Sequence, residues 1–270
     1  MTYSKLLNIL KYKLVRLIES NPSLNLLIYN NIKYFKFLLP HEKDYLGMRK
    51  LCQNSLSKVI LDIGGNLGIS SMGFRQMGFR NKIYIFEPNP VIFKKHLIKV
   101  RKNYENIVLK NIALGDSNQK KNFFIPYYKN QAIHYFGSFD KEYIDNSIQM
   151  TFPKIVSDIK FKKKKIRIKK FDNLNLKIKP HFIKIDVEGF DFLVLRGLSK
   201  TIKKYKPIFL IEYNKENFMQ ITNFLKNYEK YIYDIHTDKL INLKQKVKRR
   251  ISRSSRSNLL SNRNIYFIPK

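Results

Sequence analysis

A short apolar run that passes directly into a glycine-rich loop constrains the fold of this chain more than any other feature. Val59 to Ile63 can form one buried strand, and Gly64, Gly65 and Gly68 follow it ahead of a helical pattern. Glycine adopts positive φ without steric cost and lets a ligand approach the backbone closely. The helix after such a loop presents unpaired N–H groups in its first turn. We therefore expect a strand, a ligand-binding loop and a helix, in that order.

The same alternation of strands and helices continues along the chain. Further apolar runs that we interpret as strands lie at 82–87, 107–114, 182–186, 207–212, 231–235 and 264–268. Helical segments follow several of these runs, as in βαβ units. Strands and helices that alternate in this way form mostly parallel sheets with helices on both faces. The pattern predicts an α/β fold of this kind.

The length of 270 residues favours one main domain with additions. Residues 1–50 resemble amphipathic helices and are expected to form a helical N-terminal extension, which either caps the main domain or contacts a membrane surface or a partner helix. Residues 51–270 are expected to form the main domain. An insertion at about 117–181, between the third and fourth strands, is interpreted as hairpins and loops that recognise a substrate.

The chain is strongly basic, with 53 Lys+Arg, 20 Asp+Glu and a formal charge of +33. The densest stretch, Lys160–Lys170, holds eight basic residues in eleven positions. Biased codon usage could produce this composition, and the charge could equally attract nucleic acid, an anionic membrane or phosphorylated carriers. A single cysteine, Cys52, excludes an intrachain disulfide and a metal site built from cysteines. No apolar run is long enough to span a membrane and no signal peptide is recognisable, so we expect a cytoplasmic protein.

An acidic residue at the end of the second strand indicates a nucleoside-type cofactor. Glu87 follows Gly64 by 23 residues, a position from which a carboxylate can accept hydrogen bonds from ribose hydroxyls. Asn66 occupies the place of the second glycine of a dinucleotide loop, and Asp62 before the loop would repel a pyrophosphate but suits a cation. S-adenosylmethionine carries a sulfonium and an ammonium group, so the pattern favours methyl transfer. The alternative is a tight turn with an unrelated acid.

Four motifs in sequence order resemble the FkbM-type methyltransferases. They are Asp62–Gly68, the Phe-Glu-Pro-Asn-Pro stretch at 86–90, the Ala-Leu-Gly-Asp stretch at 113–116 and the Ile-Lys-Ile-Asp-Val-Glu-Gly stretch at 183–189. The resemblance covers about residues 59–213. It implies the Rossmann-like class I methyltransferase fold, with a seven-stranded, mostly parallel sheet, and S-adenosylmethionine as the methyl donor.

The resemblance also implies roles for residues of the cofactor site. By this comparison Gly64, Asn66 and Gly68 hold the methionine part of the cofactor, and Glu87 binds its ribose. Asp116 lies where contacts with the adenine ring are expected. The alternative is that Asp116 is only a surface turn residue, because the turn is rich in small polar residues.

Two acids at the end of the fourth strand are candidate catalytic residues. Asp186 and Glu188 could position an acceptor hydroxyl, accept its proton or hold a hard cation such as Mg²⁺ through their oxygens. The alternative is structural, with Glu188 capping the next helix and Asp186 paired with Lys184. Asp186 is the first candidate for a base, and His134 or His181 is the second. Mg²⁺ stays possible, but no metal ligands are assigned.

Family members typically methylate hydroxyls of sugars or polyketide-type products, so we expect O-methylation of a sugar or glycan intermediate in surface polysaccharide biosynthesis. A lipid-linked acceptor and peripheral contact with the anionic inner face of the membrane would suit the basic surface. Amino-directed nucleic-acid enzymes show an Asn/Asp-Pro-Pro-aromatic stretch that is absent here, and carbon-5 enzymes need a cysteine near the site, which makes nucleic acid an unfavoured substrate. The alternatives are an RNA 2′-O-methyltransferase and a non-catalytic basic adaptor that retains the fold.

Overall fold

The computed structural model describes residues 43–133, 136–234, 237–244 and 264–270. Nearly all of the expected N-terminal extension therefore lies outside the described residues. The chain divides into two compact units, whose described parts are residues 122–164 and, for the larger unit, residues 43–121 together with those from 165 onward. In the larger unit Tyr45 and Met48, from the 3₁₀ helix η3 (Lys43–Gly47) and from α3 (Met48–Leu51), are almost completely buried.

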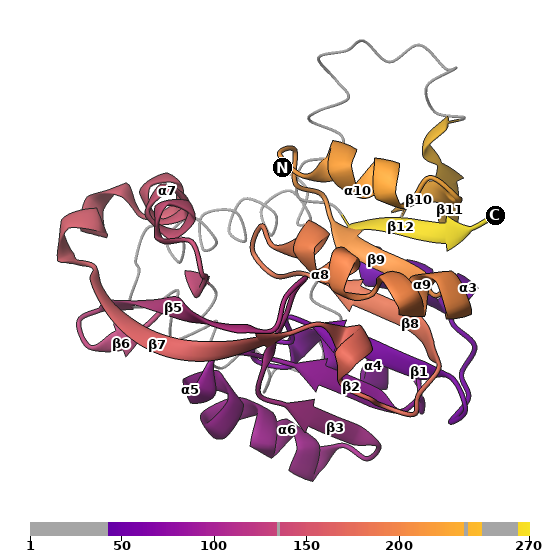
Figure 1. The fold of residues 1–270 in the computed structure, drawn as a ribbon, viewed down its shortest axis with the longest axis horizontal. Helices are drawn as coiled ribbons and strands as arrows, with labels where there is room; N and C mark the ends of the chain where they lie inside the picture. The colour runs from indigo at the N-terminus through magenta and orange to yellow at the C-terminus, as the bar shows by residue number, and fades with distance from the viewer. Residues whose placement is uncertain (1–42, 134–135, 235–236, 245–263) are drawn as a thin grey trace, which may run out of the picture. The chain divides into compact units, whose positions relative to one another are not determined.

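The larger unit is built around one mixed sheet (Figure 1). Its eight strands among the described residues follow the order β11-β10-β12-β9-β8-β1-β2-β3. Their bounds are β1 Val59–Ile63, β2 Ile83–Phe86, β3 Ile107–Lys110, β8 Pro180–Ile185, β9 Ile208–Glu212, β10 Tyr228–Asp234, β11 Lys239–Asn242 and β12 Asn264–Pro269. The pairs β3–β2, β2–β1, β1–β8 and β8–β9 are parallel, whereas β12 is antiparallel to β9 and β10, and β11 is antiparallel to β10. The α/β class is as predicted.

Two details of the sheet differ from the sequence prediction. The described sheet has eight strands instead of seven, because the short strand β11 forms a hairpin with β10. The expected third strand at 107–114 is split into β3 and β4 (Ala113–Leu114), which belong to different sheets. The split falls at Asn111, whose side-chain amide donates to the carbonyl oxygens of Glu87 and Pro88 and so ends the pairing with β2.

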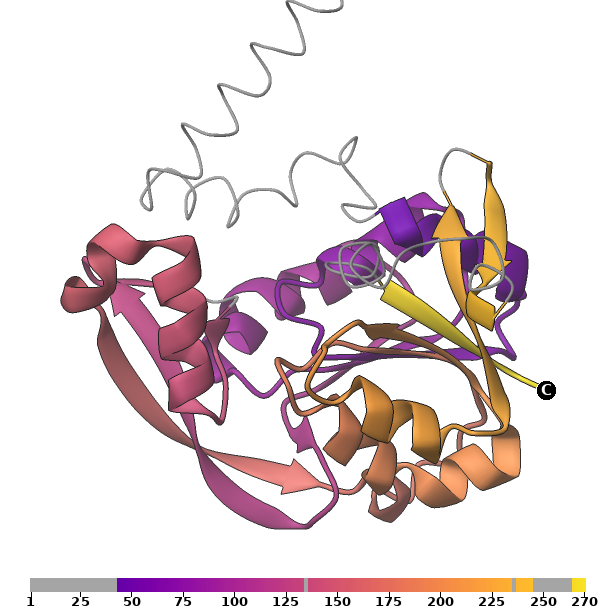
Figure 2. The same ribbon diagram turned by 90° about the horizontal axis from the view of Figure 1, so that it is seen from above.

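Helices cover both faces of the main sheet. Their bounds are α4 Ile69–Gln76, α5 Pro90–Ile92, the π-helical η4 Phe93–Leu97, α6 Ile98–Asn103, the 3₁₀ helix η7 Phe171–Asn173, α8 Asp191–Gly197, α9 Ser199–Tyr205 and α10 Phe218–Phe224. Figure 2 shows α4 to α6, in indigo to magenta, on one face and α8 to α10, in orange, on the other. All residues of β1 and β2 are buried, as expected for strands covered on both faces.

The smaller unit, residues 122–164, lies inside the expected insertion at 117–181. It contains β6 (Gln131–Ala132), α7 (Lys141–Thr151) and the 3₁₀ helix η6 (Pro153–Asp158), and it shares β5 (Gln119–Tyr128) and β7 (Lys160–Lys169) with the larger unit. These strands form a second sheet in the order β4-β7-β5-β6. A small core of its own includes Ile133, Ile144 and Ile148. The sequence analysis did not predict α7.

No helix in the described part of the chain is long and apolar enough to cross a membrane.

Candidate cofactor-binding and catalytic site

The glycine loop is fitted closely against the neighbouring strand. Gly64 and Gly68 have φ angles of 78° and 81°, which glycine adopts without strain. A Cβ atom on Gly64 would overlap the carbonyl oxygen of Asp186 at the end of β8. The N–H groups of Gly64 and Gly65 both donate to the carbonyl oxygen of Phe86, at 3.0 and 3.1 Å. Glycine is therefore required here for packing between strand ends, independently of any ligand.

Glu87 at the end of β2 is buried and holds the loop in place. Its Oε2 accepts from the backbone N–H of Asn66 at 2.8 Å, and its Oε1 accepts from the N–H of Asn89 at 2.7 Å. Burial raises the pKa of Glu87 to about 7, although these two N–H groups and the Lys184 ammonium counteract the effect. Asn66 has a φ of 45°, a conformation that asparagine tolerates better than most residues. The carboxyl group thus joins β2 to the tip of the loop.

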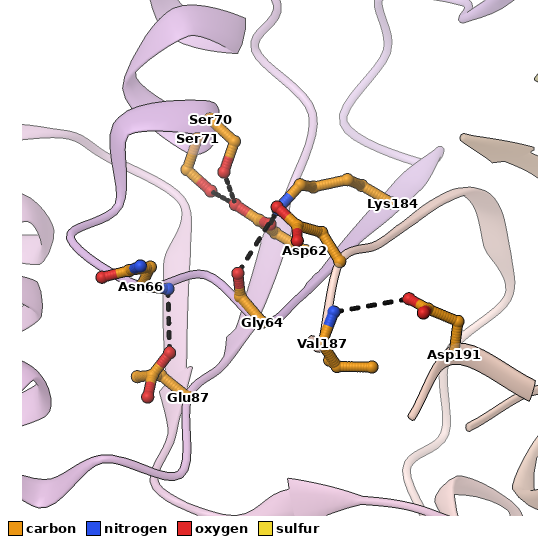
Figure 3. A network of polar contacts seen from close by, with 10 residues as sticks. Asp62, Gly64, Asn66, Ser70, Ser71, Glu87, Lys184, Val187 and Asp191 are labelled. Carbon is orange, nitrogen blue, oxygen red and sulfur yellow. Dashed lines mark hydrogen bonds and ion pairs between the residues drawn. The ribbon is translucent and has the colours of Figure 1, made fainter. Parts of the chain in front are cut away.

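A buried ammonium group lies between the ends of β1 and β8 (Figure 3). Nζ of Lys184 is 3.0 Å from Oδ2 of Asp186 and 3.5 Å from Oδ1 of Asp62, and it donates to the carbonyl oxygen of Gly64 at 3.3 Å. The other oxygen of Asp62, Oδ2, accepts from the hydroxyls of Ser70 and Ser71 in α4, both at 2.6 Å. The cluster connects two strands, the loop and the first turn of the following helix.

Burial by itself would lower the pKa of Lys184, but the acidic side chains around it reverse the effect. Asp186 contributes most, followed by Tyr45 and Asp62, and together they hold the pKa of Lys184 well above its ordinary value. The lysine is therefore a permanent cation. The side chains of Lys184 and Asp62 are 3% and 0% exposed, whereas that of Asp186 is 29% exposed. Asp186 is the member of the cluster that solvent can reach.

The segment between β8 and α8 is held by a second buried carboxyl group. Oδ1 of Asp191 accepts from the N–H of Val187 at 3.4 Å, and its Oδ2 accepts from the amide of Asn217 at 3.2 Å. Burial, and secondly the charge of Asp186, raise the pKa of Asp191 to about 6. Within this segment Glu188 and Gly189 have φ angles of 52° and 89°. The turn that carries both candidate catalytic acids is thus anchored to the helix behind it.

Comparison with known proteins assigns this arrangement to a family. A family model described as the methyltransferase FkbM domain matches residues 62–233. The chain belongs to the FkbM methyltransferase family. The match contains the glycine loop, Glu87, Lys184 and both acids at the end of β8. The predicted resemblance is therefore confirmed.

Two methyltransferases of known structure are similar to this chain at low sequence identity. The crystal structure of methyltransferase FkbM from Methylobacillus flagellatus KT is 16% identical with a TM-score of 0.49, covering 86% of this chain and 47% of that chain. The chain thus spans about half the length of that protein. Precorrin-6y C5,15-methyltransferase from Geobacter metallireducens GS-15 is 11% identical with a TM-score of 0.39, covering 83% and 84% of the two chains. A search of curated proteins finds no match.

The FkbM-family fold brings most of the expected site residues to one edge of the sheet. Asp62 lies near the end of β1, and Gly64 and Asn66 follow that strand. Glu87 follows β2 and Asp186 follows β8, because the carboxyl ends of parallel strands meet at one edge. The structural alternative for Asp186 is also observed, since it pairs with Lys184. The alternative for Glu188 is not, because α8 begins at Asp191 and its N-cap residue is Phe190.

Other expected residues lie elsewhere. Asp116 pairs with Arg196 of α8 at 3.1 Å, in a partly exposed contact. His181 occupies the opposite end of β8 from Asp186, about 16 Å away at the usual rise of a strand. His134 lies outside the described residues. Among the residues that the structure describes, no group of three or more His, Cys, Asp or Glu side chains could hold a metal ion.

Sequence reasoning missed several contacts at these strand ends. It assigned Asp62 to a cationic ligand, whereas the cation beside Asp62 in the structure is Lys184 of the protein itself. It also missed Ser70, Ser71 and Asp191. A lysine two residues before a strand-end acid, on the same side of the strand, was the available signal for the first contact.

Proposed function

We propose that the chain is an S-adenosylmethionine-dependent O-methyltransferase that transfers a methyl group to a hydroxyl of a sugar or glycan intermediate. The observation that carries the proposal is the convergence of the glycine loop, Glu87 and Asp186 at the carboxyl edge of one parallel sheet. Ligands of open α/β sheets bind at this edge. Membership of the FkbM methyltransferase family supplies the reaction class.

The residues present fit a nucleoside cofactor. A carboxylate offers about four acceptor sites, and Glu87 uses only one on each oxygen for the N–H groups of Asn66 and Asn89. Acceptor capacity therefore stays available for a ribose diol at the end of β2. Because burial raises the pKa of Glu87 to about 7, its carboxyl group can also donate one hydrogen bond near neutral pH.

The charge near the loop fits a cationic methyl donor. Two carboxylates, Asp62 and Asp186, share the single ammonium of Lys184, so this cluster has a net charge of −1. Bound S-adenosylmethionine supplies an electrophilic methyl group on a sulfonium. The protein's part is to hold donor and acceptor in line and exclude water, which can account for much of the acceleration of such a displacement.

Asp186 is the residue that we assign to the acceptor hydroxyl. Its carboxylate is the solvent-accessible member of the strand-end cluster, and a carboxylate can accept the hydroxyl proton as the new O–C bond forms. Glu188 lies in the same anchored turn and is a second candidate for orienting the hydroxyl. His134, the remaining candidate base, is outside the described residues.

Calorimetric titration with S-adenosylmethionine and with S-adenosylhomocysteine tests the cofactor. We expect micromolar binding of both, and failure of both to bind would refute the proposal. Methyl transfer from labelled donor to a panel of nucleotide sugars and glycan extracts then tests the acceptor class. Asp186→Asn should retain cofactor binding within roughly tenfold while turnover falls at least about a hundredfold.

Glu87→Ala tests the ribose contact. Loss of the carboxylate should weaken S-adenosylhomocysteine binding by about ten- to a hundredfold, because charge-assisted hydrogen bonds are lost. Glu216→Ala removes an exposed acid near the start of α10 and is the matched control. Equal affinities in the two variants would show that Glu87 does not contact the cofactor.

The acceptor is proposed to be lipid-linked, with the protein acting peripherally at the anionic inner face of the membrane. Support comes from the formal charge of +33 alone. Co-sedimentation with vesicles containing anionic lipid is the test. Absence of binding at about 0.15 M salt, where exposed charges are screened beyond about 8 Å, would remove this part of the proposal.

A further inference from the structure

The ammonium of Lys184 is the only cation that forms an ion pair with Asp62 or Asp186 among the described residues. It lies 3.0 Å from Oδ2 of Asp186 and 3.5 Å from Oδ1 of Asp62, and it donates to the backbone carbonyl oxygen of Gly64. A buried cation with an oxygen on each of three segments is held in position by them.

The two carboxylates around Lys184 are not equivalent. Asp62 is fully buried, and its second oxygen is occupied by the hydroxyls of Ser70 and Ser71. Asp186 keeps a side-chain exposure of 29%, and its Oδ2 lies 3.0 Å from the Lys184 ammonium. The negative charge left after pairing is therefore presented to a ligand by Asp186.

We propose that Lys184 is a positioning and charge-setting residue for methyl transfer: it neutralises buried Asp62 and holds the Asp186 carboxylate at the open end of β8, so that one net negative charge faces the methyl donor. This inference rests on the proposed use of S-adenosylmethionine. The consequence is a preference for the sulfonium donor over the uncharged thioether product, which favours exchange of product for donor.

Three further titratable groups influence the cluster. They are Tyr45 of η3, Glu87 after β2 and Asp191 of α8. Because the pKa values of Glu87 and Asp191 are raised to about 7 and about 6, measurements belong at a pH of about 8.5, where both are ionised in the wild-type protein.

The test is the ratio of affinities for S-adenosylmethionine and S-adenosylhomocysteine, two probes that differ in the methylated sulfonium. Asp62→Asn, which keeps an acceptor for the two serines, serves as the reference. Adding Lys184→Met to it removes one positive charge without leaving a buried anion unpaired. Relative to Asp62→Asn alone, the affinity for S-adenosylmethionine divided by that for S-adenosylhomocysteine should rise by about threefold or more in the double variant. A residue with a merely structural role would change both affinities alike, so an unchanged ratio overturns the inference.

A second variant keeps the inference testable if the double variant does not fold. Asp186→Asn preserves an oxygen for Lys184 but removes the exposed negative charge, so the ratio should fall by about threefold or more. An unchanged ratio in this folded variant also overturns the inference. If the wild-type protein binds neither probe, the proposed function itself fails. If it binds both with a ratio that no variant alters, only the role of Lys184 fails.

Discussion

Two regions of the molecule use lysine in opposite ways. At the strand ends, Lys184 is almost completely buried and is paired with two carboxylates and one backbone carbonyl oxygen. In the smaller unit, Lys162, Lys163 and Lys164 of β7 are exposed and form no ion pair with any described residue. Nζ of Lys162 lies 4.3 Å from the ring centre of Tyr127, and that of Lys163 lies 5.8 Å from the ring centre of Phe124.

The difference shows which charges carry information about function. A buried ammonium costs several kcal/mol of desolvation and persists only where its surroundings compensate for it. Exposed lysines over aromatic rings contribute about 0.5–1 kcal/mol each at most, and water solvates them in any arrangement. The single lysine at the strand ends is therefore more informative about the site than the dense basic run in β7, although the stretch Lys160–Lys170 holds eight basic residues.

Replacement of the buried lysine should have the largest effect. Lys184→Met leaves Asp62 as an unpaired buried anion, so the free energy of unfolding should fall by about 3–5 kcal/mol. Lys163→Met makes the same chemical change at an exposed position and should alter stability by less than about 0.5 kcal/mol. Urea unfolding of both variants measures the two changes in the free energy of unfolding. Similar decreases in the two variants would mean that burial does not distinguish these lysines.

The buried carboxyl group of Glu87 should give the next largest effect, as a pH dependence. Its pKa is raised from 4.5 to about 7 in the folded protein, so between these values the folded state binds more protons than the unfolded state. Stability is therefore lost as pH rises through this window, by about 3 kcal/mol in total.

Glu87→Gln isolates this contribution, because Gln does not titrate while Asp191 and all other groups are unchanged. Chemical unfolding of wild type and variant across pH 4 to 8 should show a difference in stability that moves steadily in favour of the variant. A constant difference would contradict the raised pKa of Glu87.

Removal of the exposed charges should have the smallest effect. Replacement of Lys162, Lys163 and Lys164 by Gln should change the free energy of unfolding by less than about 1 kcal/mol in all, since each loses only a solvated contact. Cofactor affinity should not change. A loss of more than about 2 kcal/mol, measured by thermal or urea unfolding, would show that these lysines support the fold and would remove the contrast with Lys184.

The sequence predicted the repeated features of the fold well. β1, β2, β8 and β9 are largely buried and apolar, so their positions in the sequence and the sheet edge with the loop followed from the pattern. β11 was missed because a four-residue strand of mixed polarity has no distinctive pattern. The division of β3 from β4 depends on the side-chain contacts of Asn111 with another strand, which periodicity does not encode.

The sequence predicted where the site residues lie in the fold, but not which side chains they contact. Strand ends located Asp62, Glu87 and Asp186 at one edge, because the topology of parallel strands requires it. The partners of Asp62 come from α4 and β8, segments up to 122 residues away in sequence, and nothing local indicates that its charge is already compensated. Asp191 was missed because its role depends on Asn217, which lies on a different segment of the chain.

The way in which the chain enters and leaves the smaller unit has a consequence for how members of this family can diversify. β5 leads out of the larger unit, β7 leads back, and the two strands are neighbours in one sheet. A segment bounded by adjacent strands is exchangeable, since a tight turn can replace everything between them while both strands keep their pairing. Residues 129–159, between the two strands, thus form a cassette that could be exchanged without altering the strand-end centre.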